Sequence, residues 1–138
     1  MIIYLIISVH YQKVIHRDIK PSNLLKADNG EVKIADLGVS DEFDGVDAML
    51  TATAGTPAFT APECLVTGAG ASVTSSGSSA FSGRAADIWS LGVTLFCLVS
   101  GYLPFAGTNV MEVYDKIRNE DPEVIDEKNK YPLALKIK

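Results

Sequence analysis

Residues 16–25, with the sequence HRDIKPSNLL, bring a carboxylate, an ammonium group and a carboxamide close together in the chain. Asp18 has the chemistry to orient a hydroxyl group and accept its proton, and Lys20 can neutralise charge on a phosphoryl group during transfer. Asn23 adds an amide oxygen. Because Pro21 keeps the run from continuing as a helix, these side chains are predicted to lie on a loop.

A second carboxylate, Asp36, follows a short distance along the chain in the sequence DLG. Gly38 lets the backbone turn away directly after this acid. Asn23 and Asp36 both offer the oxygen ligands that a hard cation such as Mg²⁺ prefers. These are the parts that phosphoryl transfer requires, namely positioning and electrostatic stabilisation with little covalent chemistry from the protein.

Short strands are predicted to hold this loop in place. Apolar runs suited to strands occur at 14–15, 24–26 and 32–35. The sequence Asp-Asn-Gly at 28–30 lies between the last two runs, and it is a strong signal for a hairpin turn because Asn and Gly tolerate positive φ angles.

Helices are predicted to surround the strands. A helix at about 84–100, apolar on every face and therefore buried, is expected to end at Gly101. A second is expected at 109–119, and the short apolar run at 1–9 is predicted to be part of a buried helix because it is too short to span a membrane. The Gly/Ser-rich stretch at 66–83 is predicted to be a flexible surface loop.

Composition places limits on the class of protein. The chain has 138 residues, enough for one ordinary domain, with 47% hydrophobic residues and a net charge of −5. This charge argues against binding to nucleic acid or to an anionic membrane. Cys64 and Cys97 lack any metal-binding or disulfide pattern, which favours a reducing intracellular compartment. His10 is interpreted as structural, because no acid or nucleophile at a motif position lies near it in the sequence.

Four motifs resemble those of protein kinases in type, order and context: residues 16–25, DLG at 36–38, GTPAFTAPE at 55–63 and DIWSLG at 87–92. They are similar to the catalytic loop, the Asp-Phe-Gly motif, the end of the activation segment and the start of the central helix of the large lobe. The resemblance implies an α+β, protein-kinase-like fold, in which a mainly helical large lobe carries a small β-hairpin. An unrelated metal-dependent hydrolase would leave the last two motifs unexplained.

Further positions resemble the calcium/calmodulin-dependent protein kinase kinases in particular. They are HYQKVI at 10–15, GVS at 38–40, Glu42, Phe43, Gly45, Asp47, Ala48 and GTPAF at 55–59. Lys20 together with Thr56 is similar to the serine/threonine class. The resemblance implies a cytoplasmic enzyme that transfers the γ-phosphate of ATP to Ser or Thr of a protein substrate, which can itself be a kinase. It also implies calmodulin as a partner that binds outside these residues, and no nucleic-acid or membrane partner.

The resemblance assigns chemical roles to particular residues, with ATP and Mg²⁺ as cofactors. Asp18 would be the catalytic base, and Lys20 would contact the γ-phosphate. Asn23 and Asp36 would bind Mg²⁺ and thereby ATP, and Leu25 would lie under the adenine ring.

Other motif positions are expected to shape the site without reacting: His16, Arg17, Leu37, Gly38, Asp87 and Trp89. His16 and Leu37, the latter in place of the usual Phe, would belong to a hydrophobic column that joins the lobes. Asp87 would anchor the catalytic loop by accepting backbone hydrogen bonds, and Trp89 is expected to pack in the core. Thr56 would link Asp18 and Lys20 beside the substrate hydroxyl, and Glu63 would end the activation segment.

The chain is thus expected to be a partial kinase catalytic domain spanning 1–138, with the catalytic loop at 16–25, the activation segment at 36–63 and the central helix at about 84–100. The sequence contains no G-x-G-x-x-G loop and no Val-Ala-Ile-Lys strand, which in kinases contact the phosphates of ATP. We therefore expect an incomplete domain that is inactive alone. The alternative is a non-catalytic kinase-like protein-binding module, which nucleotide-binding measurements with Mg²⁺ would distinguish.

The residue found at the usual phosphorylation position of the activation segment suggests how this segment is ordered. In many kinases a threonine eleven residues before the Glu of Ala-Pro-Glu is phosphorylated and bound by the Arg of His-Arg-Asp, but here that position is Ala52. Thr51 and Thr53 flank it, and the alternative is that Thr53 is phosphorylated and the segment adjusts to reach Arg17. We expect the segment to order without phosphorylation, with acidic side chains at 41–47 near Arg17.

Overall fold

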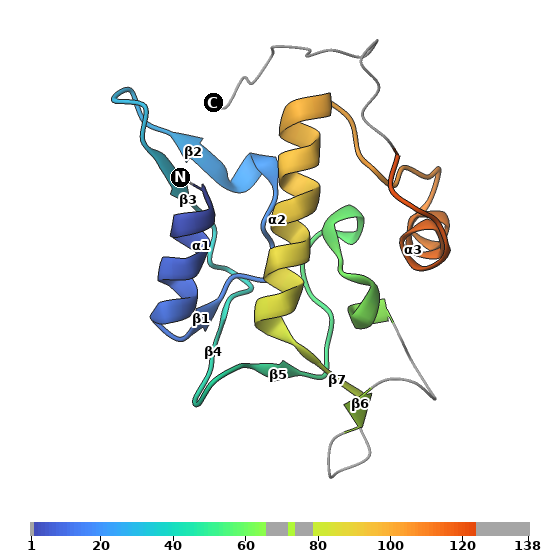
Figure 1. Cartoon of the computed structure of the whole chain (residues 1–138), viewed down its shortest axis with the longest axis horizontal. Helices are drawn as coiled ribbons and strands as arrows, with labels where there is room; N and C mark the ends of the chain where they lie inside the picture. Colours follow the sequence, from blue (N-terminus) through green and yellow to red (C-terminus); the bar gives the residue numbers. More distant parts are fainter. Residues whose placement is uncertain (1, 66–71, 74–78, 124–138) are drawn as a thin grey trace.

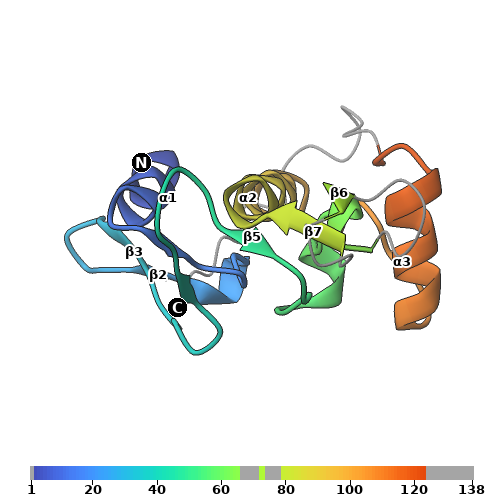
Figure 2. The same cartoon turned by 90° about the horizontal axis from the view of Figure 1, so that it is seen from below.

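A computed structural model of the chain describes residues 2–65, 72–73 and 79–123. Three α-helices are present in this part: α1 (Ile2–Tyr11), α2 (Gly83–Ser100) and α3 (Val110–Asn119). Helix α2 runs through the middle, with α1 on one side and α3 on the other, as both Figure 1 and Figure 2 show. This arrangement agrees with the mainly helical large lobe expected from the sequence.

Short antiparallel strands connect the helices. Their bounds are β1 (Val14–Ile15), β2 (Leu24–Lys26), β3 (Val32–Ile34), β4 (Asp41–Glu42), β5 (Met49–Leu50), β6 (Ser72–Val73) and β7 (Ser79–Ser82). Strand β1 pairs with β4, β2 pairs with β3, and β7 lies between β5 and β6. Three 3₁₀ turns complete the described elements, at Pro21–Asn23, Pro57–Phe59 and Pro62–Leu65.

The β2–β3 hairpin forms as predicted. Leu24 lies opposite Ile34, and Gly30 has a φ of 84°, which the turn needs and which glycine adopts without strain. The strand pairing ends at Ile34, one residue earlier than expected. Ala35 nevertheless donates its N–H to the Asn23 carbonyl at 2.8 Å, so the hairpin holds the chain just before Asp36 against Asn23.

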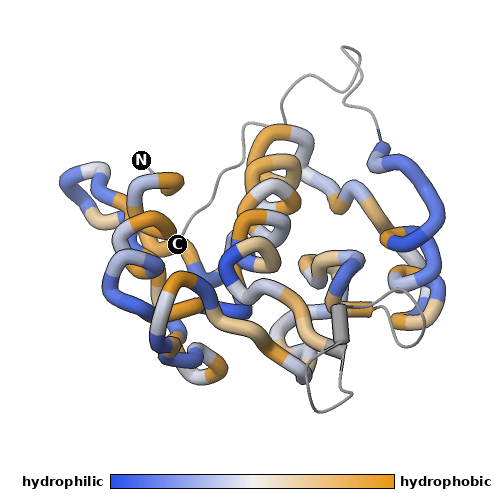
Figure 3. Tube along the Cα trace, turned by 60° about the horizontal axis from the view of Figure 1, so that its bottom comes forward, coloured by the Kyte–Doolittle hydropathy of each residue, from blue (hydrophilic) through white to orange (hydrophobic). Residues whose placement is uncertain are grey.

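Helix α2 has clear start and stop signals. The Ser82 hydroxyl accepts the backbone N–H of Ala85, and Gly101 ends the helix with a φ of 82°. These bounds confirm the predicted helix to within one residue. The expectation that it is buried on every face is wrong for the described part of the chain, because Ile88 is 51% exposed on a face that no described element covers. Figure 3 shows hydrophobic residues along most of α2 and hydrophilic residues near its start.

Helix α1 is likewise only partly buried. Ile6 and His10 are buried, whereas Ile3, Ile7 and Tyr11 are exposed on the opposite face. The prediction of a helix here is confirmed, and the prediction that it is buried is wrong for that face. No helix in the described residues is long and apolar enough to cross a membrane.

The described residues form three small hydrophobic clusters, two of which include the catalytic loop or the strand that leads into it. Ile6, Ile19 and Leu91 join α1, the loop and α2, while Ile15, Phe43 and Ala48 join β1 to the activation segment. A third cluster, formed by Leu65, Phe105, Val113 and Ile117, packs α3 against the 3₁₀ turn that ends the activation segment. The catalytic loop is therefore supported from below by packed apolar side chains.

The Gly/Ser-rich stretch is not a loop throughout. Ser79–Ser82 form β7, which pairs with β5, and Gly83 already begins α2. The sequence contains no strand periodicity here, and the strand exists because β5 and β6 offer it hydrogen-bonding partners. Residues 66–71 and 74–78 lie outside the described residues, so the prediction is not tested there.

Candidate active site

The backbone of the catalytic loop is held by one buried carboxylate. Asp87, which is 1% exposed near the start of α2, accepts the backbone N–H groups of His16 and Arg17, each at 2.8 Å. His10 also donates to it from Nε2 at 2.8 Å. Satisfying a buried carboxylate in this way fixes the loop relative to α2, since losing a donor would leave buried charge unpaired.

The His16 ring orients the catalytic loop through two hydrogen bonds. The ring donates from Nε2 to the Ala35 carbonyl at 3.1 Å and accepts the Asp18 N–H at Nδ1, at 3.3 Å. These two bonds fit the neutral tautomer protonated at Nε2. His16 is fully buried, so its role in this structure is to join the catalytic loop to the segment that precedes Asp36.

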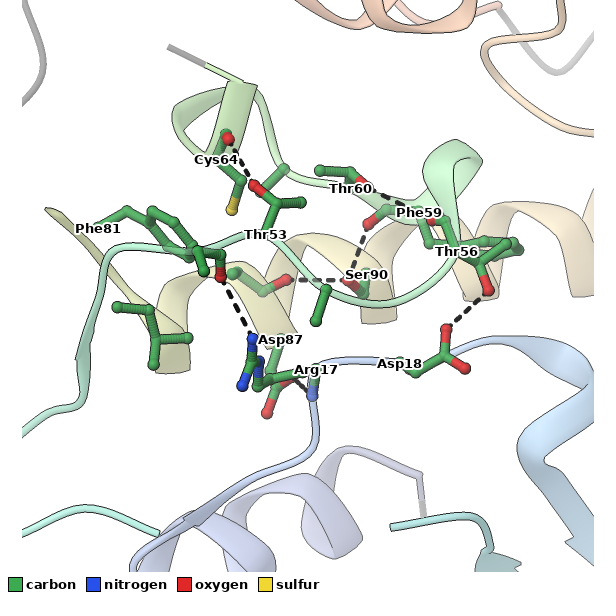
Figure 4. Close-up of a pocket in the computed structure, with 15 residues that line it drawn as sticks. Arg17, Asp18, Thr53, Thr56, Phe59, Thr60, Cys64, Phe81, Asp87 and Ser90 are labelled. Carbon is green, nitrogen blue, oxygen red and sulfur yellow. Dashed lines mark hydrogen bonds between the residues drawn. The ribbon is translucent and has the colours of Figure 1, made fainter. Parts of the chain in front are cut away.

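Asp18, Lys20 and Thr56 form a closed triangle of hydrogen bonds. Lys20 donates to Asp18 Oδ2 at 2.7 Å and to the Thr56 hydroxyl at 2.8 Å. Thr56 donates to Asp18 Oδ1 at 2.7 Å, and Figure 4 shows its hydroxyl pointing at that carboxylate. The structure therefore brings together a carboxylate, an ammonium group and a hydroxyl from two separate segments, as the resemblance implied.

These contacts keep Asp18 ionised. Burial raises the pKa of the Asp18 carboxyl, but hydrogen bonds from Lys20, Thr56 and Asn23 together with the charge of Lys20 outweigh it, and the pKa lies below the ordinary value of 3.8. At neutral pH the group is an anionic acceptor aimed at the neighbouring hydroxyl.

Asn23 and Asp36 fit a site for Mg²⁺ and ATP phosphates. Asn23 Nδ2 donates to the Asp18 carbonyl at 2.8 Å, which leaves its Oδ1 as the atom that can bind a cation. Asp36 is exposed, and only its Oδ1 accepts a described hydrogen bond, from Gly38 N–H at 3.2 Å. Two oxygens from the protein suffice, because Mg²⁺ completes its octahedron with phosphates and water.

Backbone strain marks two of the motif positions. Arg17 and Asp36 have φ angles of 68° and 65°, and Lys13 is the third non-glycine residue with positive φ in the described chain. Such conformations cost about 1–3 kcal/mol each and persist only where surrounding contacts enforce them.

Leu25 and Leu37 are both on the surface. Leu25 is 46% exposed at the edge of the hairpin, and an apolar ring could lie against it. Leu37 is 58% exposed in the described part of the chain, and the column that would join it and His16 to a second lobe stays a prediction. Ser40 donates both its N–H and its hydroxyl to the Leu37 carbonyl and closes a turn directly after Asp36.

The activation segment approaches the catalytic loop most closely at Gly55. Its φ is 92°, and a Cβ placed there would lie 2.2 Å from the Arg17 carbonyl oxygen. Only glycine allows this approach, which places Thr56 within hydrogen-bonding distance of Asp18.

Arg17 contacts the activation segment at two points. Its guanidinium donates to the Asp41 carboxylate and to the Ala52 carbonyl, both at 3.2 Å. Ala52 is the residue that the register placed beside Arg17, and Asp41 belongs to the expected acidic stretch. The geometry is thus that of an ordered segment in which a carboxylate of the chain itself contacts Arg17.

The remaining motif residues are Trp89 in α2 and Glu63 at the end of the activation segment. Trp89 is half-buried and stacks on Phe105 with a centroid separation of 6.1 Å, which fits the expected core role. Glu63 is exposed, and the described residues give it no ion pair.

A cavity of about 30 Å³ lies between the activation segment and α2, lined by Cys64 and Ser90 among others (Figure 4). It is large enough for water but not for a nucleotide.

Several contacts of the site were not foreseen. His10 was expected to be structural, but its partner Asp87 lies 77 residues away and could not be found by local reasoning. Thr94, fully buried within α2, donates to the Ile19 carbonyl at 3.3 Å. A polar residue between the apolar Val93 and Leu95 was the only available signal for this contact.

Comparison with known proteins gives a consistent result. Residues 2–137 match the family model described as the protein kinase domain. The chain is 56% identical over 119 residues to the calcium/calmodulin-dependent protein kinase kinase of Caenorhabditis elegans, covering 86% of this chain and 20% of that protein. It is 47% identical over 112 residues to the serine/threonine-protein kinase GRIK2 of Arabidopsis thaliana, covering 80% of this chain and 25% of that protein. The chain therefore spans about a quarter or less of the length of these relatives.

Proposed function

Since the chain belongs to the protein kinase domain family, we propose that it contributes the catalytic loop and activation segment of a serine/threonine protein kinase. The reaction is transfer of the γ-phosphate of ATP to a hydroxyl of a protein substrate. The observation that supports this proposal best is the Thr56 hydroxyl, which bridges Asp18 and Lys20. It places the activation segment against the carboxylate that the reaction requires.

Asp18 acts on the substrate hydroxyl. The ionised carboxylate accepts the hydroxyl hydrogen bond and directs the oxygen towards the γ-phosphorus. As the oxygen–phosphorus bond forms, the bond from phosphorus to the leaving ADP oxygen breaks and the hydroxyl proton passes to Asp18. The contacts of Asp18 lower its pKa and make it a weaker base, and the hydroxyl becomes more acidic as its oxygen bonds to phosphorus.

The other polar residues bind and stabilise the phosphates. Lys20 contacts the γ-phosphate and offsets its charge as it moves. Asn23 Oδ1 and Asp36 would hold Mg²⁺, which when bound would supply positive charge to the phosphates. Leu25 offers an apolar surface to the adenine ring.

The name of the Caenorhabditis elegans relative suggests a substrate class and a regulator. We propose that the substrate is another protein kinase. Calmodulin targets are typically basic amphipathic helices, and none of the three described helices is of this kind, since α1 and α2 carry only one Lys or Arg between them and α3 is mixed in charge. Calmodulin is therefore expected not to bind residues 2–123, which a pull-down of the chain with Ca²⁺-calmodulin would test.

A chimera tests the catalytic proposal. Residues 10–119 replace the aligned segment of the Caenorhabditis elegans relative, and transfer of radiolabelled phosphate from ATP to an inactive protein kinase is measured. The expected result is transfer to Ser or Thr, reduced about 10²–10⁴-fold by Asp18→Asn. Asp28→Asn makes the same chemical change on the exposed hairpin turn and serves as the matched control, with no expected loss.

The chimera also separates the alternatives. A folded chimera that binds the partner kinase without transferring phosphate would contradict the proposal and favour the non-catalytic binding module. Equal loss of activity in Asp18→Asn and Asp28→Asn would show that the carboxylate at position 18 has no specific role.

A further inference from the structure

The stretch of the activation segment between β4 and β5 is attached to the start of α2 through Asp47. Its carboxylate accepts the hydroxyl of Ser82 at Oδ2 and the backbone N–H of Arg84 at Oδ1, the latter at 3.4 Å. The same oxygen accepts the N–H of Ala48 at 2.8 Å. Asp47 is half-buried, so these bonds to a charged acceptor are partly shielded from water.

Backbone contacts extend this attachment on both sides. Gly83 donates its N–H to the Ala48 carbonyl at 2.8 Å, and Arg84 donates from its guanidinium to the Val46 carbonyl at 2.8 Å. Strand β5 then pairs with β7, with Met49 opposite Ser82. Figure 2 shows β5 and β7 side by side where the chain enters α2. The residues from 46 to 50 are thereby held against the turn that begins the helix.

Ser82 links the two segments through one hydroxyl group. It caps α2 by accepting the Ala85 N–H at 3.0 Å while it donates to Asp47. The N-terminal end of a helix carries partial positive charge, which favours a carboxylate at this point. The carboxylate of Asp47 therefore stabilises the start of α2, and the cap residue Ser82 in turn donates a hydrogen bond to that carboxylate.

This attachment lies close in sequence to Thr56, which contacts Asp18. Thr56 follows the end of β5 by six residues, and the intervening Ala52 carbonyl is bonded to Arg17. Fixing residues 46–50 shortens the free chain that must otherwise be ordered before Thr56 can reach Asp18. None of these contacts uses a phosphate group.

We propose that Asp47, bound to the N-terminal end of α2, is a positioning residue that holds the activation segment and, through it, Thr56 against Asp18. The proposal deepens the kinase function and rests on it for its catalytic consequence. Its structural content, a segment ordered by the Asp47–Ser82 contact, can be tested without any phosphoryl transfer.

Amide hydrogen exchange of the 138-residue chain provides the test, because it reports local opening of one segment against the rest of the molecule. Asp47→Ala is expected to raise the exchange rate over residues 43–56 about 10- to 100-fold, the size expected for lost hydrogen bonds to a charged group. Amides in the middle of α2, at 91–99, are expected to keep their parent rates.

Two variants at position 82 separate the contact with Asp47 from the capping of α2, since Asn and Asp cap a helix about as well as Ser. Ser82→Asn keeps an N–H donor for Asp47 and is expected to leave exchange unchanged. Ser82→Asp places two carboxylates together and is expected to behave as Asp47→Ala does. Adding Asp47→Asn to Ser82→Asp lets the new amide donate to the new carboxylate. The double variant is therefore expected to restore protection of residues 43–56 against exchange.

The possible outcomes divide clearly. Unchanged exchange over 43–56 in Asp47→Ala, equal increases throughout the chain, or no protection of this segment in the parent would each overturn the proposal. In the chimera, Asp47→Ala is expected to lower phosphate transfer about tenfold while Ser82→Asn does not. An inactive chimera with the expected exchange pattern would refute the proposed function and leave the Asp47 contact standing.

Discussion

Gly55→Ala adds a single methyl group at a position where the catalytic loop leaves no room for it. An added Cβ would lie 2.2 Å from the Arg17 carbonyl oxygen, whereas real Cβ contacts stay above 3.0 Å. The activation segment must therefore move by about 0.8 Å or more, since a backbone carbonyl held by the loop cannot give way. That shift breaks the 2.7 Å bond between Thr56 and Asp18.

The expected magnitude has two parts. A positive φ costs an alanine about 1–2 kcal/mol, and overpacking against the catalytic loop adds about 1–3 kcal/mol. Gly45 isolates the first part, because its φ is 86° and nothing lies within 4 Å of the position of its Cβ. Gly45→Ala is thus the matched control, expected to lower the free energy of unfolding by the backbone contribution alone.

Both variants are to be compared by denaturant unfolding of the 138-residue chain and by phosphate transfer in the chimera. Gly55→Ala is expected to lower the transfer rate about 10²-fold, the cost of a displacement near 1 Å, and Gly45→Ala to leave it within about threefold of the parent. Equal stability losses in the two variants, or full activity in Gly55→Ala, would refute the reasoning.

Other predictions follow from the charges and thiols of the site. Because the folded-state pKa of Asp18 lies below 3.8, its contacts stabilise the fold above that pH and are lost as the pH falls through the lower value. Lys20→Met is therefore expected to destabilise at pH 6 by denaturant unfolding, with the difference from the parent shrinking below pH 3.8, and a difference that does not depend on pH would contradict this. In the chimera, phosphatase treatment, Thr51→Ala and Thr53→Ala are each expected to leave activity within about threefold of the parent, and collapse on phosphatase treatment and in either variant would show that a phosphate is needed. Burial, with a smaller effect from a neighbouring acid, raises the pKa of Cys64 to about 12, so iodoacetamide at pH 8 is expected to alkylate it at least about 100-fold more slowly in the folded chain than after unfolding, as followed by mass spectrometry.

Local signals were sufficient for much of the fold. The hairpin turn at 28–30 and the stop at Gly101 depend on conformations that few residue types adopt, and both were predicted from the sequence. The bridging position of Thr56 came from the resemblance of its motif, because no local rule relates a threonine to a carboxylate 38 residues earlier.

The features that sequence reasoning missed are set by tertiary contacts. Ser79–Ser82 form a strand because β5 and β6 pair with them, and serine has no intrinsic preference that would predict it. The exposure of Ile88 depends on which neighbours cover α2, which periodicity within one helix cannot reveal.

The position of Asp87 has a consequence for synthesis of the chain. The backbone N–H of Arg17 is made 70 residues before the carboxylate that accepts it. At about 5–20 residues per second, the ribosome needs about 4–14 s to cover that distance. During this interval the catalytic loop has no acceptor for these groups, and its apolar neighbours lack α2 to pack against. We therefore expect the nascent catalytic loop to need protection from misfolding until α2 has emerged.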